Sequence, residues 1–215
     1  MNKVKLMILL EQMEQNSVSA NSSQSTLLRA HRKAEKLNAP ALLPILREII
    51  ENSNTKEKQE IRKNAYFIIA SLLKKTMRSV YCQYLVDRLG IENDKYVLSS
   101  MLDGIAQLHI PNDVDLSLLI ECTRSDQWLV RHSAINALSA SNSECSREAA
   151  RYWVAQSDEK TYKYEIIYAN AVLGSIGDSK DINILERHID SDIVDVKESA
   201  LYAIKSIVAR NNKNS

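Results

Sequence analysis

The stretch that decides the fold is SDQWLVRHSAINALSA, residues 125–140, because its pattern returns 66 residues later as SDIVDVKESALYAIKS, residues 191–206. Each stretch opens with Ser-Asp, and a valine followed by a basic residue stands five positions after the serine. Apolar residues then follow that valine at offsets of 4, 7 and 8. These offsets lie on one stripe of an α-helix, so each stretch is predicted to be an amphipathic helix that begins near its Ser-Asp pair.

The same two signals recur elsewhere in the chain. Acidic helix starts stand at Asp94, Asp126, Asp158 and Asp192, at spacings of 32, 32 and 34 residues. The apolar ladder with offsets 4, 7 and 8 also begins at Ile61 and Val97, and small residues occupy offset 7 in several copies, which would let a neighbouring helix approach closely. A period of about 33 residues indicates a repeat protein in which each repeat is one pair of helices.

The periodicity gives expected bounds for the helices. First helices are expected near residues 55–76, 94–108, 126–140, 159–176 and 192–209, and second helices near 78–89, 113–123, 144–156 and 179–189. A further pair is expected at 25–37 and 40–51, and an N-terminal helix at about 2–14. We therefore predict two segments: residues 1–24, an N-terminal helix with a Ser/Asn/Gln-rich linker, and residues 25–215, one continuous repeat array that frays from Asn211.

The repeat resembles HEAT repeats and their bacterial HEAT-like relatives of the phycobilin-lyase type. The matching residues are Asp126, Val130, Arg131, Ala134, Ala137 and Leu138, then 173–178, and Asp192, Val196, Lys197, Ala200 and Ala203. The likeness covers residues 55–209 well and 25–54 loosely, and it departs from the family at 162–164, where Tyr-Lys-Tyr replaces Val-Arg. The resemblance implies an all-α fold: a right-handed α–α superhelix (alpha-solenoid) of about five to six HEAT-like two-helix repeats.

Composition narrows the class of protein. The chain has 215 residues, 45% hydrophobic and 26% charged, with 4 Gly and 3 Pro, too few to punctuate a many-stranded sheet. Its net charge of +1 argues against a dedicated nucleic-acid binder. Cys82, Cys122 and Cys145 are far apart, so neither disulfides nor a zinc site are expected, and a reducing cytoplasm is the predicted location. No apolar run is long enough for a signal core or a membrane span.

No catalytic, cofactor or metal site is predicted. His31, His109, His132 and His188 are scattered, without a His-Glu motif. Gly174 to Asp178 contains GxxG but lacks the Lys-Ser/Thr of a phosphate loop, and a helix end at Gly177 followed by a helix start at Asp178 explains it. No GxSxG elbow is present. The protein is therefore predicted not to be an enzyme.

Aromatic residues gather between positions 128 and 168: Trp128, Tyr152, Trp153, Tyr162, Tyr164 and Tyr168. Packing in the core or between repeats is the favoured interpretation, and a partner-binding patch is the second. A third arises from DNA glycosylases built of HEAT-like repeats, which hold damaged DNA with tryptophans, an acid and basic residues. The fragment from Asp126 to Arg131 contains these residue types, although the repeat motif already accounts for Asp126 and Arg131.

The HEAT resemblance implies that second helices line the concave surface, where a partner would bind. The side chains predicted to contact it are Tyr84, Arg88, Glu121, Arg151, Tyr152 and Arg187. Their mixed charges suit another protein better than a polyanion or a membrane. The leading hypothesis is a non-enzymatic interaction module, an adaptor or an immunity-type inhibitor. Two alternatives remain: a DNA-repair protein resembling the HEAT-like glycosylases, and a lyase or chaperone resembling the phycobilin-attachment proteins.

Overall fold

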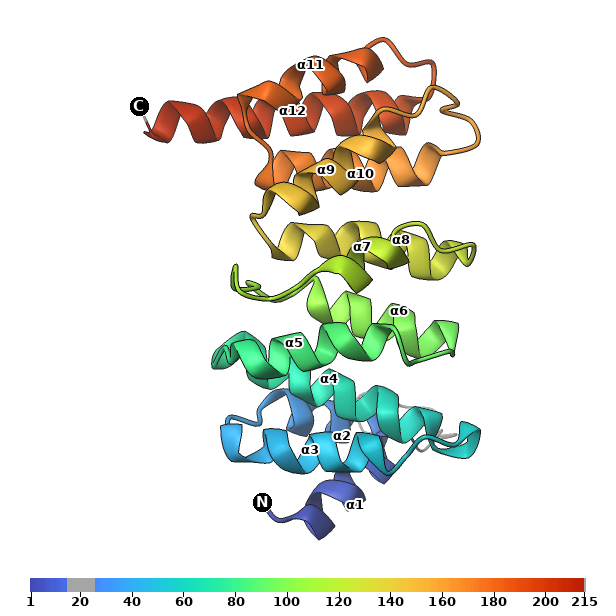
Figure 1. Ribbon diagram of the computed structural model, residues 1–215, viewed down its shortest axis with the longest axis vertical. Coiled ribbons are helices and arrows are strands. Elements are labelled where there is room, and N and C mark those ends of the chain that lie inside the picture. The colour runs from blue at the N-terminus through green and yellow to red at the C-terminus, as the bar shows by residue number, and fades with distance from the viewer. Residues whose placement is uncertain (15–25, 215) are drawn as a thin grey trace. The chain divides into compact units, whose positions relative to one another are not determined.

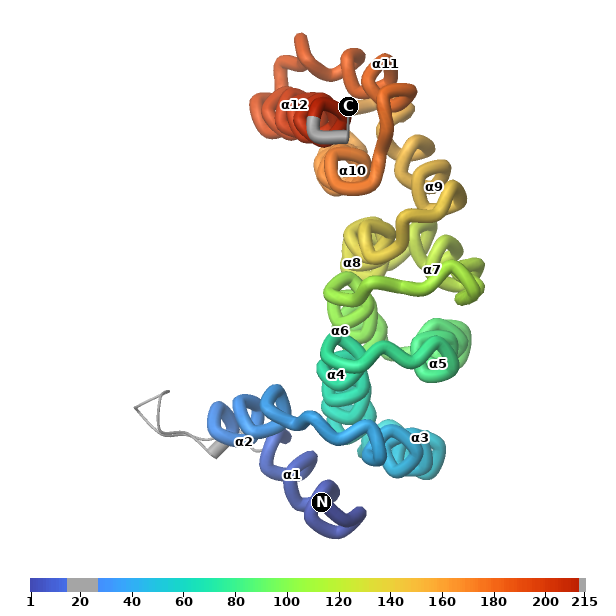
Figure 2. Tube along the Cα trace, turned by 90° about the vertical axis from the view of Figure 1, so that its left-hand side faces the viewer, coloured from blue at the N-terminus to red at the C-terminus, as the bar shows by residue number. Residues whose placement is uncertain are grey.

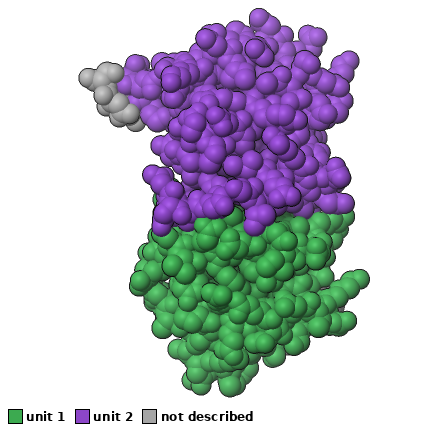
Figure 3. All heavy atoms as spheres, in the orientation of Figure 1, with its two compact units in different colours: residues 1–109 green, residues 110–215 purple. Residues whose placement is uncertain are grey.

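All regular structure in the described part of the chain is helical. The computed structural model describes residues 1–14 and 26–214 (Figure 1). The predicted linker, residues 15–24, lies outside the described residues. The chain divides into two compact units, residues 1–109 and 110–215 (Figure 3). Among the described residues, no helix is both long and apolar enough to cross a membrane.

Unit 1 is built around one long helix. Its elements are α1 (Lys3–Glu14), α2 (Thr26–Glu35), α3 (Leu43–Glu51), α4 (Gln59–Lys75), α5 (Ser79–Leu89) and α6 (Lys95–Ile105), with short 3-10 turns at Pro40–Leu42 and Lys56–Lys58. Helix α4 packs against each of the other five helices. The buried side chains of α1 (Leu6, Leu9, Leu10 and Met13) make that helix part of unit 1.

Unit 2 repeats the pairing of helices. Its elements are α7 (Ser117–Cys122), α8 (Trp128–Ala137), α9 (Glu144–Val154), α10 (Lys163–Ile176), α11 (Ile182–Leu185) and α12 (Val194–Asn214), with 3-10 turns at Leu138–Ala140, Ser179–Asp181 and Glu186–His188. Figure 2 shows the first helices α8, α10 and α12 along one side of this unit, and the second helices α7, α9 and α11 along the other. Helix α10 packs against α8, α9 and α12.

The predicted apolar ladder is confirmed at three of its four starting residues, whereas the fourth, Ile61, is only partly buried. Val97, Val130 and Val196 are all at most 2% exposed. The departure at 162–164 is resolved by the structure of α10, in which Ile166 takes the valine position and is fully buried. Ile166 lies 36 residues after Val130 and 30 before Val196. One interval is longer and the next is shorter than the period of about 33 residues, so the repeat after α10 is back in register.

Small residues allow the close approach that the sequence predicted. A Cβ on Gly104 of α6 would lie 3.1 Å from the Cβ of Ala70 on α4. A Cβ on Gly174 of α10 would lie 3.0 Å from the Cα of Ala203 on α12. The absence of a side chain at these two positions brings neighbouring first helices together.

The predicted helix starts are made by different atoms in different repeats. Asp94 caps α6, since its Oδ1 accepts hydrogen bonds from the backbone N–H groups of Tyr96 and Val97. Just before α8 and α12 the serine of the Ser-Asp pair accepts a backbone hydrogen bond instead: Ser125 Oγ from Gln127 N–H, and Ser191 Oγ from Ile193 N–H. Because either a serine hydroxyl or an aspartate carboxylate can accept such a backbone hydrogen bond, the position of the aspartate alone locates the helix start imprecisely.

The end of α10 is held by two features. Asp178 and Asp181 form a capping box immediately after Gly177, as expected for a helix stop followed by a helix start. Arg210 of α12 donates hydrogen bonds to the backbone carbonyls of Gly174, Ser175 and Gly177. The expectation that the tail frays from Asn211 is wrong, because α12 continues to Asn214.

Candidate protein-binding surface

The arginine of the Val-Arg motif has a structural role in both units. In unit 2, Arg131 donates from Nε to Glu165 Oε1 at 2.7 Å, and from Nη1 to the carbonyl of Ser125 at 2.6 Å. In unit 1, Arg62 makes a two-pronged pair with Glu92 at 2.8 and 2.9 Å. The motif arginine therefore ties its helix to an acid from the next repeat.

Glu165 is a buried acid kept in its charged form. Burial alone would raise the pKa of this carboxyl, but hydrogen bonds from the backbone, from Arg131 and from His132 outweigh that effect and lower it. The Nε2 atom of His132 lies 3.1 Å from the same carboxylate oxygen that Arg131 contacts. Glu165 thus fixes two side chains of α8 from its position on α10.

An aromatic cluster surrounds His132. The centroid of its ring lies 5.6 Å from that of Trp128, 5.8 Å from that of Tyr164 and 5.4 Å from that of Tyr168. Trp128 is 62% exposed, Tyr164 58% and Tyr168 38%, so these three rings pack on His132 while facing solvent. We call these four residues the aromatic surface.

A hollow of about 530 Å³ opens at the aromatic surface. Its lining residues are Trp128, Arg131, His132, Thr161, Tyr164, Glu165 and Tyr168. The lining thus combines exposed aromatic rings with the ion pair of Arg131 and Glu165. Such a hollow can accept an apolar or aromatic side chain that brings one polar group with it.

Repetition places these side chains on the same side of successive helices. Trp128 stands two residues before the buried Val130, and Tyr164 stands two residues before the buried Ile166. The corresponding residue on α12 is Val194, which is 63% exposed. The surface of the first helices in unit 2 is therefore apolar at an equivalent position in three consecutive repeats.

The aromatic residues between 128 and 168 divide into two groups. Trp153 is 6% exposed and contacts the rings of Tyr152 and Tyr162, as the packing interpretation expected. Trp128 and Tyr164 instead belong to the exposed aromatic surface. Sequence position relative to the apolar ladder could have separated the two groups. Trp128 and Tyr164 each stand two residues before a buried ladder residue, but this is visible only once Ile166 is recognised as the ladder residue of α10.

Two of the six predicted contact residues lie inside unit 1. Tyr84 and Arg88 of α5 are each 8% exposed. The Tyr84 hydroxyl is buried without a hydrogen-bond partner among the described residues, and burial raises its pKa well above the ordinary value. Arg88 Nε donates to the hydroxyl of Tyr66 at 2.9 Å.

The other four predicted residues lie in unit 2, on or beside its second helices. Glu121 and Arg187 are exposed. Tyr152 is 46% exposed, and the guanidinium of Arg124 lies 5.1 Å from the centre of its ring. The structure brings Arg151 and Tyr152 together on α9.

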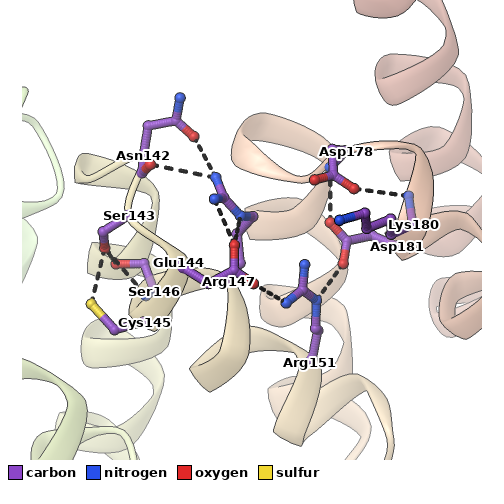
Figure 4. Close-up of polar contacts among 10 residues, drawn as sticks. All are labelled: Asn142, Ser143, Glu144, Cys145, Ser146, Arg147, Arg151, Asp178, Lys180 and Asp181. Atoms are coloured by element: carbon purple, nitrogen blue, oxygen red, sulfur yellow. Dashed lines mark hydrogen bonds and ion pairs between the residues drawn. The ribbon is translucent and has the colours of Figure 1, made fainter.

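Arg151 is held by two acids (Figure 4). It pairs with the buried Asp181 and with the exposed Glu144, each at 2.5 Å. Hydrogen bonds from Arg151 and Arg147 lower the pKa of Glu144 to about 2. A partner that bound Arg151 would have to compete with these contacts.

Two of the other three histidines contact residues 29 to 36 positions away within their own units. The buried His188 lies 2.5 Å from Glu159 and 2.7 Å from the carbonyl of Val154, and His31 contacts the ring of Phe67 edge-on. Among the described residues, no group of three or more His, Cys, Asp or Glu side chains is placed to hold a metal ion.

The sequence matches no family model and no curated protein sequence. Solved structures do match. A designed armadillo repeat protein is 18% identical, with a TM-score of 0.52, covering 94% of this chain and 99% of that chain. An engineered protein from a structural genomics consortium is 16% identical, with a TM-score of 0.50, covering 97% of this chain and 98% of that chain. At such identities the likeness shows the fold alone: this chain has an all-α solenoid repeat fold of the armadillo/HEAT type.

Proposed function

We propose that this protein is a non-enzymatic interaction module that binds a partner protein through the aromatic surface of unit 2. The observation that carries the proposal is the exposure of Trp128, Tyr164 and Tyr168 around one hollow. Tryptophan and tyrosine are the side chains most enriched among interface residues with large energetic effects. An exposed cluster of such rings is unusual on a surface that meets only water.

The rigidity of the surface supports this proposal. Glu165 holds Arg131 and His132 in place, and the ring of His132 contacts all three exposed aromatics. Side chains fixed before binding lose little conformational entropy when a partner arrives. The role is that of an adaptor or of an inhibitor that covers another protein, and the repeat fold is common to modules of this kind.

The chemistry of the hollow favours a protein over DNA as the partner. Its arginine, Arg131, is already paired with Glu165, and the buried carboxylate would repel a phosphate. The chain's net charge of +1 gives no general attraction for a polyanion. The proposed partner therefore presents an apolar or aromatic side chain.

The test is quantitative capture of partners from the native host on the immobilised full-length chain. Wild type is compared with the double variant Trp128→Ala/Tyr164→Ala, since both side chains are more than half exposed and their removal should leave the fold intact. We expect one stoichiometric protein to bind wild type and at least roughly tenfold less of it to bind the double variant, as for loss of central interface aromatics.

Two control variants show which surface the partner contacts. Tyr96→Ala removes a tyrosine of unit 1 that is 58% exposed, and it should bind the partner like wild type. Tyr152→Ala tests the second-helix surface that the sequence predicted. Loss of binding with Tyr152→Ala and not with the double variant would refute the aromatic surface, as would salt-sensitive DNA retention that the double variant abolishes.

A further inference from the structure

Unit 1 contains a second hollow of a different character. It has a volume of about 560 Å³ and opens between the turn before α4, the end of α5 and the loop before α6. Its lining residues are Asn54, Lys56, Gln59, Arg62, Arg88, Ile91, Glu92, Asn93 and Asp94. All but one of these side chains are polar, and Asn54, Lys56 and Asn93 are exposed at its mouth.

Arg88 is a buried cation without an acidic partner among the described residues. Its guanidinium donates to the Tyr66 hydroxyl at 2.9 Å and makes a long contact of 3.5 Å with the side-chain oxygen of Asn54. Neither acceptor is charged, and the arginine is 8% exposed. A buried charge is costly unless a countercharge or strong hydrogen bonds compensate it.

The two acids of the hollow are already engaged. Glu92 receives the two-pronged pair from Arg62 and also faces the backbone N–H groups of Asn93 and Asp94. Asp94 accepts two backbone hydrogen bonds at the start of α6. Neither carboxylate forms an ion pair with Arg88, so its guanidinium is the buried charged group that the described lining of the hollow leaves without a counterion.

We propose that this hollow binds a single carboxylate group, with Arg88 as its main contact and Lys56 at its rim. A guanidinium presents two parallel N–H donors that match the two oxygens of a carboxylate. The hollow is lined by three cations, Lys56, Arg62 and Arg88, and by two acids, Glu92 and Asp94, which leaves one positive charge. That balance suits a monoanion better than a doubly charged phosphate. The site lies within unit 1 and does not depend on the aromatic surface.

The experiment is an NMR titration of the full-length chain with sodium acetate as the carboxylate probe, at constant ionic strength maintained with sodium chloride. We expect a saturable shift of the Arg88 Nε–Hε signal and of the Asn93 amide. Arg88→Met should weaken the affinity read at Asn93 roughly tenfold or more, and Lys56→Gln a few-fold, as charge-assisted contacts require.

Matched variants and probes decide the outcome. Arg47→Gln removes an exposed arginine that pairs with Glu51 outside the hollow, and it should bind acetate like wild type. Lys56→Gln changes an exposed residue and keeps the test available if Arg88→Met does not fold. Inorganic phosphate that binds more tightly than acetate would overturn the choice of ligand. A linear, unsaturated shift, or a Lys56→Gln variant with wild-type affinity, would overturn the site.

Discussion

Neighbouring first helices carry the same motif in two different settings, α4 and α6 in unit 1 and α8 and α10 in unit 2. Arg62 and Glu92 have side chains that are 7% and 4% exposed, whereas Arg131 is 20% exposed above a Glu165 that is 4% exposed. Both arginines line a hollow, but the motif arginine is nearly fully buried in unit 1 and partly exposed in unit 2. The motif therefore specifies the framework, whereas residues that flank the buried stripe determine the surface.

The largest expected effect comes from breaking the motif ion pair in the two settings. Arg62→Ala leaves a buried Glu92 uncompensated, and we expect it to lower the free energy of unfolding by about 3 kcal/mol. Arg131→Ala leaves Glu165 with hydrogen bonds from His132 and from the backbone, so we expect a loss of about 1 to 2 kcal/mol. Urea unfolding followed by circular dichroism measures both changes.

The double variant Arg62→Met/Glu92→Leu serves as the control for this pair. It should recover part of the stability lost in Arg62→Ala, because it removes both buried charges. The recovery is incomplete because the carbonyls of Ser53 and Thr55 lose the hydrogen bonds that Arg62 donates. Equal losses for Arg62→Ala and Arg131→Ala would mean that depth of burial does not distinguish the two settings.

Two glycines that bring first helices together, Gly104 and Gly174, should differ in how well they tolerate a methyl group. Gly174→Ala places a methyl group 3.0 Å from the backbone of Ala203, so overpacking should outweigh the gain in helix propensity and cost about 1 kcal/mol. In Gly104→Ala the new methyl group meets only the Cβ of Ala70, beside an open hollow lined by Phe67 and Ser71. We therefore expect this variant to change the free energy of unfolding by at most about 0.5 kcal/mol in either direction. Thermal unfolding midpoints of the two variants provide the measurement. A larger loss for Gly104→Ala would show that α4 and α6 are the less adaptable pair.

The framework could be predicted from the sequence because it depends on local spacing. Offsets of 4 and 7 from Val130 and Val196 located buried residues correctly, and the small residues at offset 7, Gly104 and Ala203, indicated where helices approach. The start of α10 could not be fixed, because Tyr162 to Tyr164 hide the valine position and the interval there is three residues longer than the period.

The surface was harder to predict than the framework. Tyr84 and Arg88 have the residue types of interface contacts, but α5 packs against α4, and Arg47 of α3 lies 5.0 Å above the Tyr84 ring. Which polar residue beside a buried stripe is covered depends on neighbours 20 to 40 residues away, such as Tyr66 and Arg47. Such contacts leave no local signal in one sequence.

The smallest expected effect concerns one aromatic side chain from each unit, Phe67 of α4 and Trp128 of α8. Phe67 of α4 is partly buried against His31, so Phe67→Ala should lower the free energy of unfolding by about 1 kcal/mol. Trp128 of α8 is 62% exposed, and Trp128→Ala should change that free energy by less than about 0.5 kcal/mol in spite of the larger ring that it removes. Urea unfolding of the two variants side by side makes the comparison. A stability loss for Trp128→Ala that exceeds the loss for Phe67→Ala would mean that the exposed rings chiefly hold α8 to α10. Their exposure would then no longer support a binding role, whereas near-neutral behaviour leaves recognition as the reason for their arrangement.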